Sequence, residues 1–207
     1  MRFDRLTTKF QQAIADAQSM ALAADNGYIE PQHLLLSLLN QEDSGTASLL
    51  SRAGVNVAPL MTALTKAIDR LPKVEGQGGE ISASRELTNL LNLTDKIATK
   101  RGDQFIASEI FLLALADDKG DTGRLLKEYG LTRKALESAI EAVRGGAAVD
   151  SPGEREGVPY ESGARCNTRS IPSSRSNRCT LARSQLVSKS ATSAEEWRFW
   201  NVLFGAR

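Results

Sequence analysis

The chain has 207 residues, of which 26 are basic and 25 acidic, and 41% are hydrophobic. This length suffices for one good hydrophobic core. The even charge balance argues against a nucleic-acid partner, and no run approaches the roughly 18 apolar residues of a spanning helix, so we expect no membrane partner. No apolar signal segment opens the sequence, which favours a cytoplasmic protein.

The averages hide a change of composition near residue 147. Residues 1–146 carry 17 basic and 19 acidic residues, whereas residues 147–207 carry nine and six. Leu, Ile, Val and Phe make up only 10 of those 61 tail residues, too few to support a core. Both cysteines lie there, so we expect neither a disulfide framework nor a metal site. The sequence predicts a folded body over residues 1–146 and a disordered tail over residues 147–207.

Four helices are predicted in the first half of the body, with apolar residues at three- and four-residue spacing. We expect Thr8 and Gln11 to form a capping box at the first helix. Gly54 and Pro72 suit the ends of the third and fourth helices. The expected elements are residues 8–24, a second helix starting at Pro31, residues 46–53 and a fourth helix capped by Asn56.

The same pattern then restarts after a Gly-rich connector. The string "NGYIEPQHLLLSLL" at residues 26–39 matches "DQFIASEIFLLALA" at residues 103–116, and the two are 77 positions apart. Four further helices follow this pattern: residues 84–101, one from Ser108, one ending before Gly130 and one from Thr132.

No segment shows the sustained alternation of a strand. We therefore predict an all-α fold of eight helices with pseudo-two-fold symmetry. It is a tandem duplicated four-helix repeat, with repeat 1 over about residues 1–72 and repeat 2 over about residues 84–146. Neither half, at roughly 70 residues, buries its apolar stripes easily alone.

The repeated strings "YIEPQHLLLSLL" and "FIASEIFLLAL" resemble the double Clp repeat domain, the N-terminal domain of the Clp family of AAA+ unfoldases. Three further strings, "MRFDRLTTKFQQAIADAQSMA", "AIDRLPKVEGQGG" and "RGDQFIASEIF", are similar to the ClpB-type disaggregases of that family. The resemblance covers residues 1 to about 150 and stops in the tail.

This resemblance implies a domain that binds unfolded or aggregated polypeptides, truncated before its ATPase modules. No G-x-x-x-x-G-K-[ST] string occurs in the sequence, so we expect no enzyme activity and no cofactor. Two alternatives stay open: an adaptor-docking domain of a protease-linked Clp unfoldase, and an inactive truncated product. Other Clp subunits are further candidate partners. Because hexamers of the family form through the ATPase modules, we expect a monomer.

One hypothesis accounts for the unusual tail as a frameshifted reading. Residues 169–174, "RSIPSS", can be encoded by a string that gives Leu-Asp-Pro-Val-Ile one base earlier. The family has that string shortly before its first nucleotide site.

Differences between the two halves indicate candidate binding residues. Leu93 aligns with Asp16, so repeat 2 is apolar where repeat 1 is charged. Leu93 and Ile97 lie four positions apart on one helix face. Together with Ile110 they are our candidates for an exposed hydrophobic strip of the kind that binds partners.

Polar candidates come from the family resemblance. Thr7, Asp103 and Glu109 match a polar cluster implicated in substrate handling in ClpB-type domains. Asp103 and Glu109 align with the neutral amides Asn26 and Gln32. A structural role for Glu109 is equally open, because a carboxylate near a helix N-terminus gains from the helix dipole. His33, the single histidine, lacks partners for a metal site or a catalytic triad.

Overall fold

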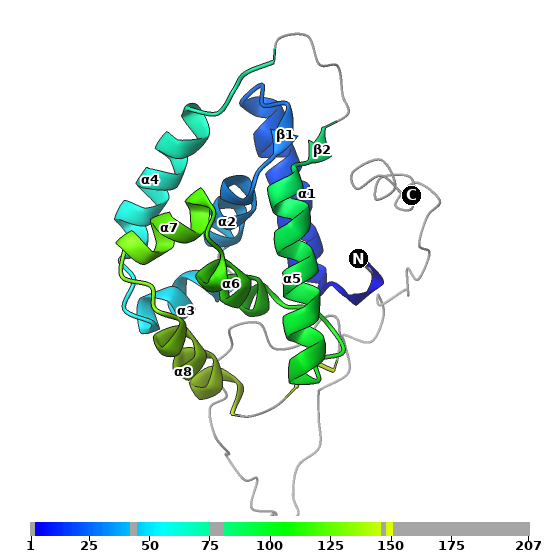
Figure 1. The fold of residues 1–207 in the computed structure, drawn as a ribbon, viewed down its shortest axis with the longest axis vertical. Helices are drawn as coiled ribbons and strands as arrows, with labels where there is room; N and C mark the ends of the chain where they lie inside the picture. The colour runs from blue at the N-terminus through cyan, green and yellow to red at the C-terminus, as the bar shows by residue number, and fades with distance from the viewer. Residues whose placement is uncertain (1–2, 42–44, 75–80, 146–147, 151–207) are drawn as a thin grey trace, which may run out of the picture.

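The computed structural model describes residues 3–41, 45–74, 81–145 and 148–150, which contain eight α-helices and two very short strands. The all-α prediction is confirmed, with four helices in each half (Figure 1). The expected disorder from residue 151 onward lies outside the described residues. The elements are a 3-10 turn Phe3–Arg5, α1 Thr8–Ala23, β1 Tyr28–Ile29, α2 Pro31–Asn40, α3 Thr46–Arg52, α4 Val57–Asp69, β2 Ser82–Ala83, α5 Arg85–Arg101, α6 Ser108–Asp117, α7 Asp121–Glu128 and α8 Arg133–Arg144.

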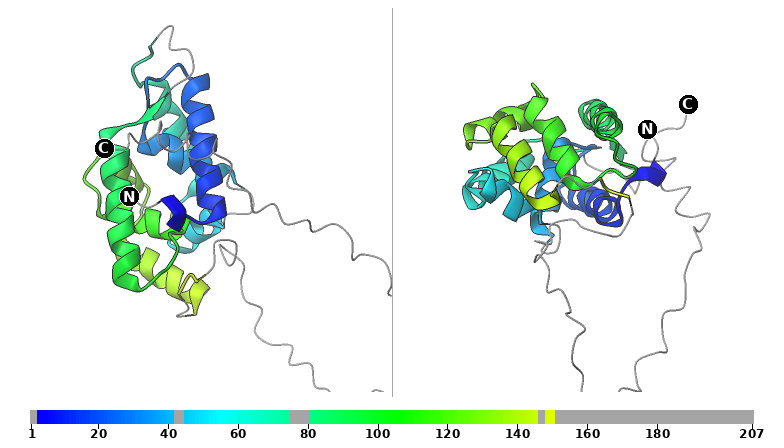
Figure 2. Two further views of the ribbon diagram at one scale, coloured as in Figure 1. Left: turned by 90° about the vertical axis from the view of Figure 1, so that its right-hand side faces the viewer. Right: turned by 90° about the horizontal axis from the view of Figure 1, so that it is seen from below.

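The helices form three layers. The long helices α1 and α5 run in opposite directions along one side of the molecule (Figures 1 and 2). Helices α3, α4, α7 and α8 lie on the other side, and α2 and α6 lie between the two groups. This position explains the sequences of the central helices: nearly every residue of α2 and α6 is buried. The Phe10 and Phe111 rings, one from each half, meet at 5.6 Å between centroids in the core.

The two halves are joined by reciprocal backbone pairing. β1 pairs in parallel with β2, so Ile29 of repeat 1 lies beside Ala83 of repeat 2. The equivalent bridge joins Leu6 to Ile106. Each half thus gives the other a short extended segment, which the helical periodicity did not predict.

The helix N-termini have the expected kind of capping residue, with small corrections to the predicted positions. The predicted capping box of Thr8 and Gln11 is wrong by one residue, because Thr7 is the N-cap of α1 and its Oγ1 accepts from the Phe10 N–H. Ser84 caps α5 in the equivalent way. Asn56 is the N-cap of α4 as expected, although its side chain makes no capping hydrogen bond.

The turn after α1 and the turn after α5 need the same unusual backbone conformation. Gly102 ends α5 with φ of 80°, and at the equivalent place Asp25 has φ of 55°. Glycine has no Cβ to clash there, so repeat 2 carries the less strained residue.

Among the described residues, no helix is both long enough and apolar enough to span a membrane.

A candidate binding face and its buried ion-pair cluster

A buried ion-pair cluster lies where α8 ends beside the start of α6. Arg144 Nη1 donates to both carboxylate oxygens of Asp103, at 3.0 and 2.9 Å. Its Nε donates to Glu109 Oε1 at 2.9 Å. The three side chains are only 8%, 1% and 11% exposed, respectively. The polar candidates Asp103 and Glu109 therefore lie together, but they face an arginine of the same chain.

Arg144 stays charged in this environment. Burial lowers the pKa of its guanidinium, but the neighbouring Glu109 and Asp103 carboxylates raise that pKa by more. One arginine between two carboxylates leaves the cluster with a formal charge of −1. Arg144 Nη2 is buried without a hydrogen-bond partner, so the pairing uses two of its three nitrogens.

Arg5 holds the turn after α5 from the opposite side. Its guanidinium donates to the backbone carbonyl of Asp103 at 2.7 Å and to that of Gln104 at 3.0 Å. It also forms an ion pair of 2.9 Å with Asp95 on α5. The turn that carries Asp103 is thus fixed by two arginines from the two ends of the described body.

Repeat 1 has a neutral network at the equivalent position. The His33 Nδ1 accepts from the Glu30 N–H, so Nε2 carries the proton and donates to Asn26 Oδ1, at 3.0 Å in both bonds. Asn26 Nδ2 then donates to the Pro72 carbonyl at 3.3 Å. Burial of His33 lowers its pKa to about 4. The single histidine is therefore a structural member of the core edge.

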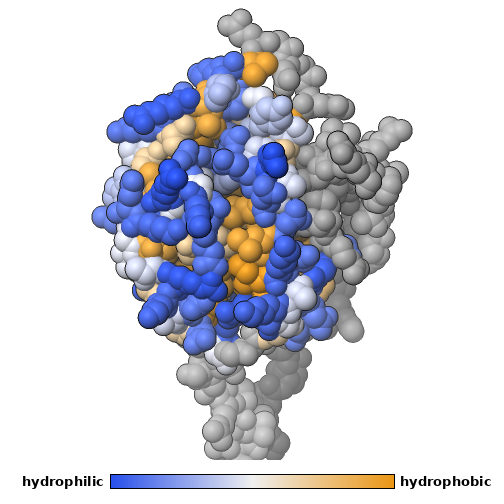
Figure 3. All heavy atoms as spheres, viewed as in Figure 1, coloured by the Kyte–Doolittle hydropathy of each residue, from blue (hydrophilic) through white to orange (hydrophobic). Residues whose placement is uncertain are grey.

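The hydrophobic candidates separate into two groups. Leu93 and Ile97 are partly buried on α5 and pack against the core. The expectation that Ile110 belongs to an exposed strip is wrong, because Ile110 is 0% exposed. It lies within the buried run of α6, which begins at Ser108, and its repeat 1 counterpart is His33. An apolar area bordered by hydrophilic residues is visible where α5 lies beside α6 (Figure 3).

Thr7 is buried as well. It is 2% exposed, and its backbone N–H donates to the Ile106 carbonyl at 3.1 Å. Its side chain caps α1, as Ser84 caps α5. Its position in the structure accounts for a threonine here without requiring contact with another molecule.

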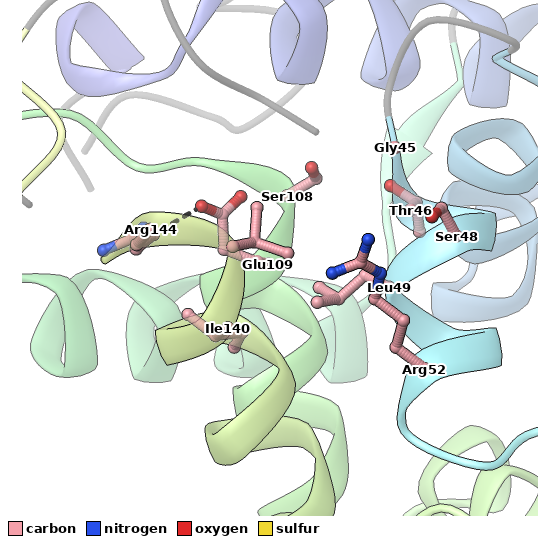
Figure 4. A pocket seen from close by; sticks show the side chains of 10 residues that line it. Gly45, Thr46, Ser48, Leu49, Arg52, Ser108, Glu109, Ile140 and Arg144 are labelled. Carbon is pink, nitrogen blue, oxygen red and sulfur yellow. Dashed lines mark hydrogen bonds and ion pairs between the residues drawn. The ribbon is translucent and has the colours of Figure 1, made fainter. Parts of the chain in front are cut away.

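A pocket lies between the halves on the side of α3. It is bordered by α3 on one side and by α6 and α8 on the other (Figure 4). Leu49, Ile140 and Val143 supply its apolar surface, and the Glu109–Arg144 pair lies at one edge. Within the described ranges, no cluster of three or more His, Cys, Asp or Glu residues could hold a metal ion.

Sequence reasoning missed both arginines of this region. Arg144 is the last residue of α8, and at an offset of 76 it corresponds to Ile68. Arg144 has no charged counterpart in repeat 1, and it lies in the same half as Asp103 and Glu109. This difference was the sequence feature that could have indicated the ion pair. Arg5 gave no comparable signal, because it lies in the short 3-10 turn before α1, outside every predicted helix.

Comparison with known proteins identifies relatives of this body. Residues 5–129 match the family model of the Clp repeat (R) N-terminal domain. The chaperone protein ClpB of Vibrio cholerae is 52% identical over 156 residues, which are 75% of this chain and 18% of that protein. The chain therefore spans less than a fifth of the length of curated relatives such as this one.

Solved structures show the same fold. The N-terminal domain of Hsp104 from Candida albicans matches with a TM-score of 0.63 at 22% identity, covering 71% of this chain and 96% of that domain. A ClpV N-domain in complex with a VipB peptide matches with a TM-score of 0.55 at 19% identity, covering 70% and 90%.

Proposed function

The chain belongs to the Clp repeat (R) N-terminal domain family, and we propose that its body is the client-binding domain of a ClpB-type chaperone. The observation that carries this proposal is the pair Leu93 and Ile97 on α5, which are only partly buried although both are large and apolar. Apolar surface bordered by polar residues is typical of sites that bind other proteins.

The proposed chemistry is weak, reversible capture of hydrophobic segments from unfolded or aggregated polypeptides. An extended segment that covers Leu93 and Ile97 removes further apolar area from water, which gives roughly 25 cal/mol for each Å². Polar groups at the edge of the area orient the segment. The ClpV N-domain that binds a VipB peptide supports peptide capture by this fold.

We propose that the remaining candidate residues have a structural role and stabilise this binding face. Asp103 and Glu109 connect the turn after α5 to the start of α6 through their shared partner Arg144, Ile110 packs in the core, and all three are at most 9% exposed. Thr7 fixes the start of α1. In this proposal they do not contact client polypeptides, and they affect client binding only by holding α5 in place.

Titration of an unfolded, fluorescently labelled model protein tests the proposal. We expect Leu93→Asp to weaken binding about tenfold, because a charge in the apolar area must be desolvated. Leu125→Asp is the matched control, since Leu125 is also partly buried but lies on α7. Circular dichroism checks that both variants remain helical. Equal affinities for the wild type and Leu93→Asp would remove the proposed site.

The adaptor-docking alternative gives a different result in this titration and in a pull-down from a cell extract. A domain that recognises a folded adaptor would leave the unfolded protein unbound and retain a single stoichiometric partner from a cell extract. For a longer protein that contained this body, we propose ATP-driven disaggregation, a role in the stress response and a cytoplasmic location. We further propose that the body alone is a monomer.

A further inference from the structure

The segment that leaves the body after α8 is bound to the turn after α5. Val149 N–H donates to Asp103 Oδ1 at 3.2 Å. The Val149 carbonyl accepts from the N–H groups of Gln104 and Phe105, at 3.1 and 3.2 Å. Val149 is only 9% exposed. Residues 148–150, which the sequence assigned to the tail, thus lie against the body.

Repeat 1 makes a similar fold-back at the equivalent place, through different hydrogen bonds. After α4 the Val74 N–H donates to the Asp25 carbonyl at 2.8 Å, and Lys73 bridges Asn26 in antiparallel register. The Asn26 side chain donates to the Pro72 carbonyl. Because the contact occurs in both halves, the segment after the fourth helix of each repeat has a defined place on its own repeat.

The side chain that holds the exit segment differs between the halves, and each side chain has the donor or acceptor that its hydrogen bond requires. Asn26 has an amide that donates to a backbone carbonyl. Asp103 instead accepts from the Val149 N–H, and the same Oδ1 also accepts from Arg144. A carboxylate offers only acceptors, and it has enough of them for both donors.

We propose that Asp103, held in place by Arg144, is a latch that fixes the exit segment 148–150 and so sets the direction in which the chain leaves the domain. In a longer protein the latch determines how the body is oriented toward whatever follows. Asp103 is a positioning residue in this scheme and touches no client. The latch does not rest on the proposed client site, although Asp103 also supports α5 there.

Amide hydrogen exchange in the full chain tests the latch. We expect slow exchange at Gln104 and Phe105 in the wild type. Asp103→Asn replaces one carboxylate oxygen with a donor, so we expect exchange at both amides to accelerate about tenfold or more. Amides in the middle of α5 keep their rates. Asp117→Asn is the control, because Asp117 pairs with another α8 arginine, Arg133, at the opposite end of α6.

Val149→Pro tests the same contact without touching the ion pair. Proline has no N–H, so the bond to Asp103 is lost while Arg144 keeps both carboxylates. Val149→Ala keeps the N–H and is its control. The latch predicts faster exchange at Gln104 and Phe105 in the proline variant alone. Wild-type exchange rates at those amides in Val149→Pro would overturn the proposal, even if Asp103→Asn fails to fold.

The outcomes separate the latch from the proposed client site. The latch predicts that Val149→Pro leaves affinity for the unfolded protein unchanged. Leu93→Asp should do the reverse, weakening client binding without changing exchange at Gln104 and Phe105. Fast exchange at both amides in the wild type would refute the latch and leave the client site unaffected.

Discussion

The two repeats place the same backbone turn in the same position but stabilise it with different chemistry. Repeat 1 uses neutral hydrogen bonds that run from His33 through Asn26 to a backbone carbonyl. Repeat 2 uses the charged cluster of Arg144, Asp103 and Glu109. A polar network at a buried turn can thus be exchanged as a set, provided that each donor meets an acceptor.

The largest expected effect comes from breaking the charged network. Arg144→Met leaves Asp103 and Glu109 buried without a cation, which should cost about 3–5 kcal/mol of unfolding free energy. Urea denaturation at pH 7 measures this loss. Arg133→Met is the matched control on the same helix. Its ion pairs with Asp117 and Glu137 are substantially exposed, so we expect a loss below about 1 kcal/mol. Equal losses of unfolding free energy in the two variants would show that the buried cluster contributes no more to stability than the exposed ion pairs of Arg133.

The neutral network should respond to pH instead. The pKa of His33 is about 4 in the folded chain, below its ordinary value of 6.5, so the unfolded chain binds the proton more tightly. This contribution to stability is complete above pH 6.5 and is lost as the pH falls toward 4. Between pH 7.5 and pH 5 we expect His33 to contribute a loss of about 2 kcal/mol, measured by urea denaturation as the difference between the wild type and a variant without this histidine.

His33→Gln removes this titration and serves as the control. His33 is the single histidine of the chain, so the variant should lose much less stability than the wild type over the same pH interval. Parallel stability profiles for the two proteins would contradict the assignment.

Loss of the two equivalent helix caps should have similar effects, although the Ser84 side chain also hydrogen-bonds the Glu30 carboxylate. Thr7→Ala and Ser84→Ala each remove a side chain that accepts from a first-turn N–H, and each should cost about 1 kcal/mol. Thermal unfolding of the two variants measures the difference. A much larger loss for Thr7→Ala would show that its side chain does more than cap α1.

The smallest effect is expected at a position where the repeats already differ. The Ser37 hydroxyl donates to the Ala13 carbonyl at 2.8 Å, whereas the equivalent residue of repeat 2 is the buried Ala114. Ser37→Ala should therefore cost only about 0.5–1 kcal/mol in urea denaturation. A loss of several kcal/mol would show that repeat 1 depends on this bond.

Periodicity and caps sufficed to predict the helices of the described body. Apolar spacing and residues such as Thr132 and Gly54 gave their number, order and approximate ends. The short strands were not predictable in this way, because two residues carry no period. Their pairing partners come from the other half of the sequence.

The candidate site was predicted only in part. Alignment of the repeats correctly marked Asp103 and Glu109 as different from repeat 1. It could not show their partner, because Arg144 lies 41 and 35 positions away and meets them only through packing of α8 on α6. The error at Ile110 has a related cause: a residue at the start of a central helix is buried on every side.

The reciprocal pairing of Leu6 with Ile106 and of Ile29 with Ala83 has a consequence for synthesis on the ribosome. The first extended segment to emerge must wait about 100 residues for its complement, so repeat 1 leaves the exit tunnel with an unpaired edge. A single repeat made alone would carry that edge permanently, and a second copy could pair with it. In this chain the second repeat supplies that pairing partner within one polypeptide.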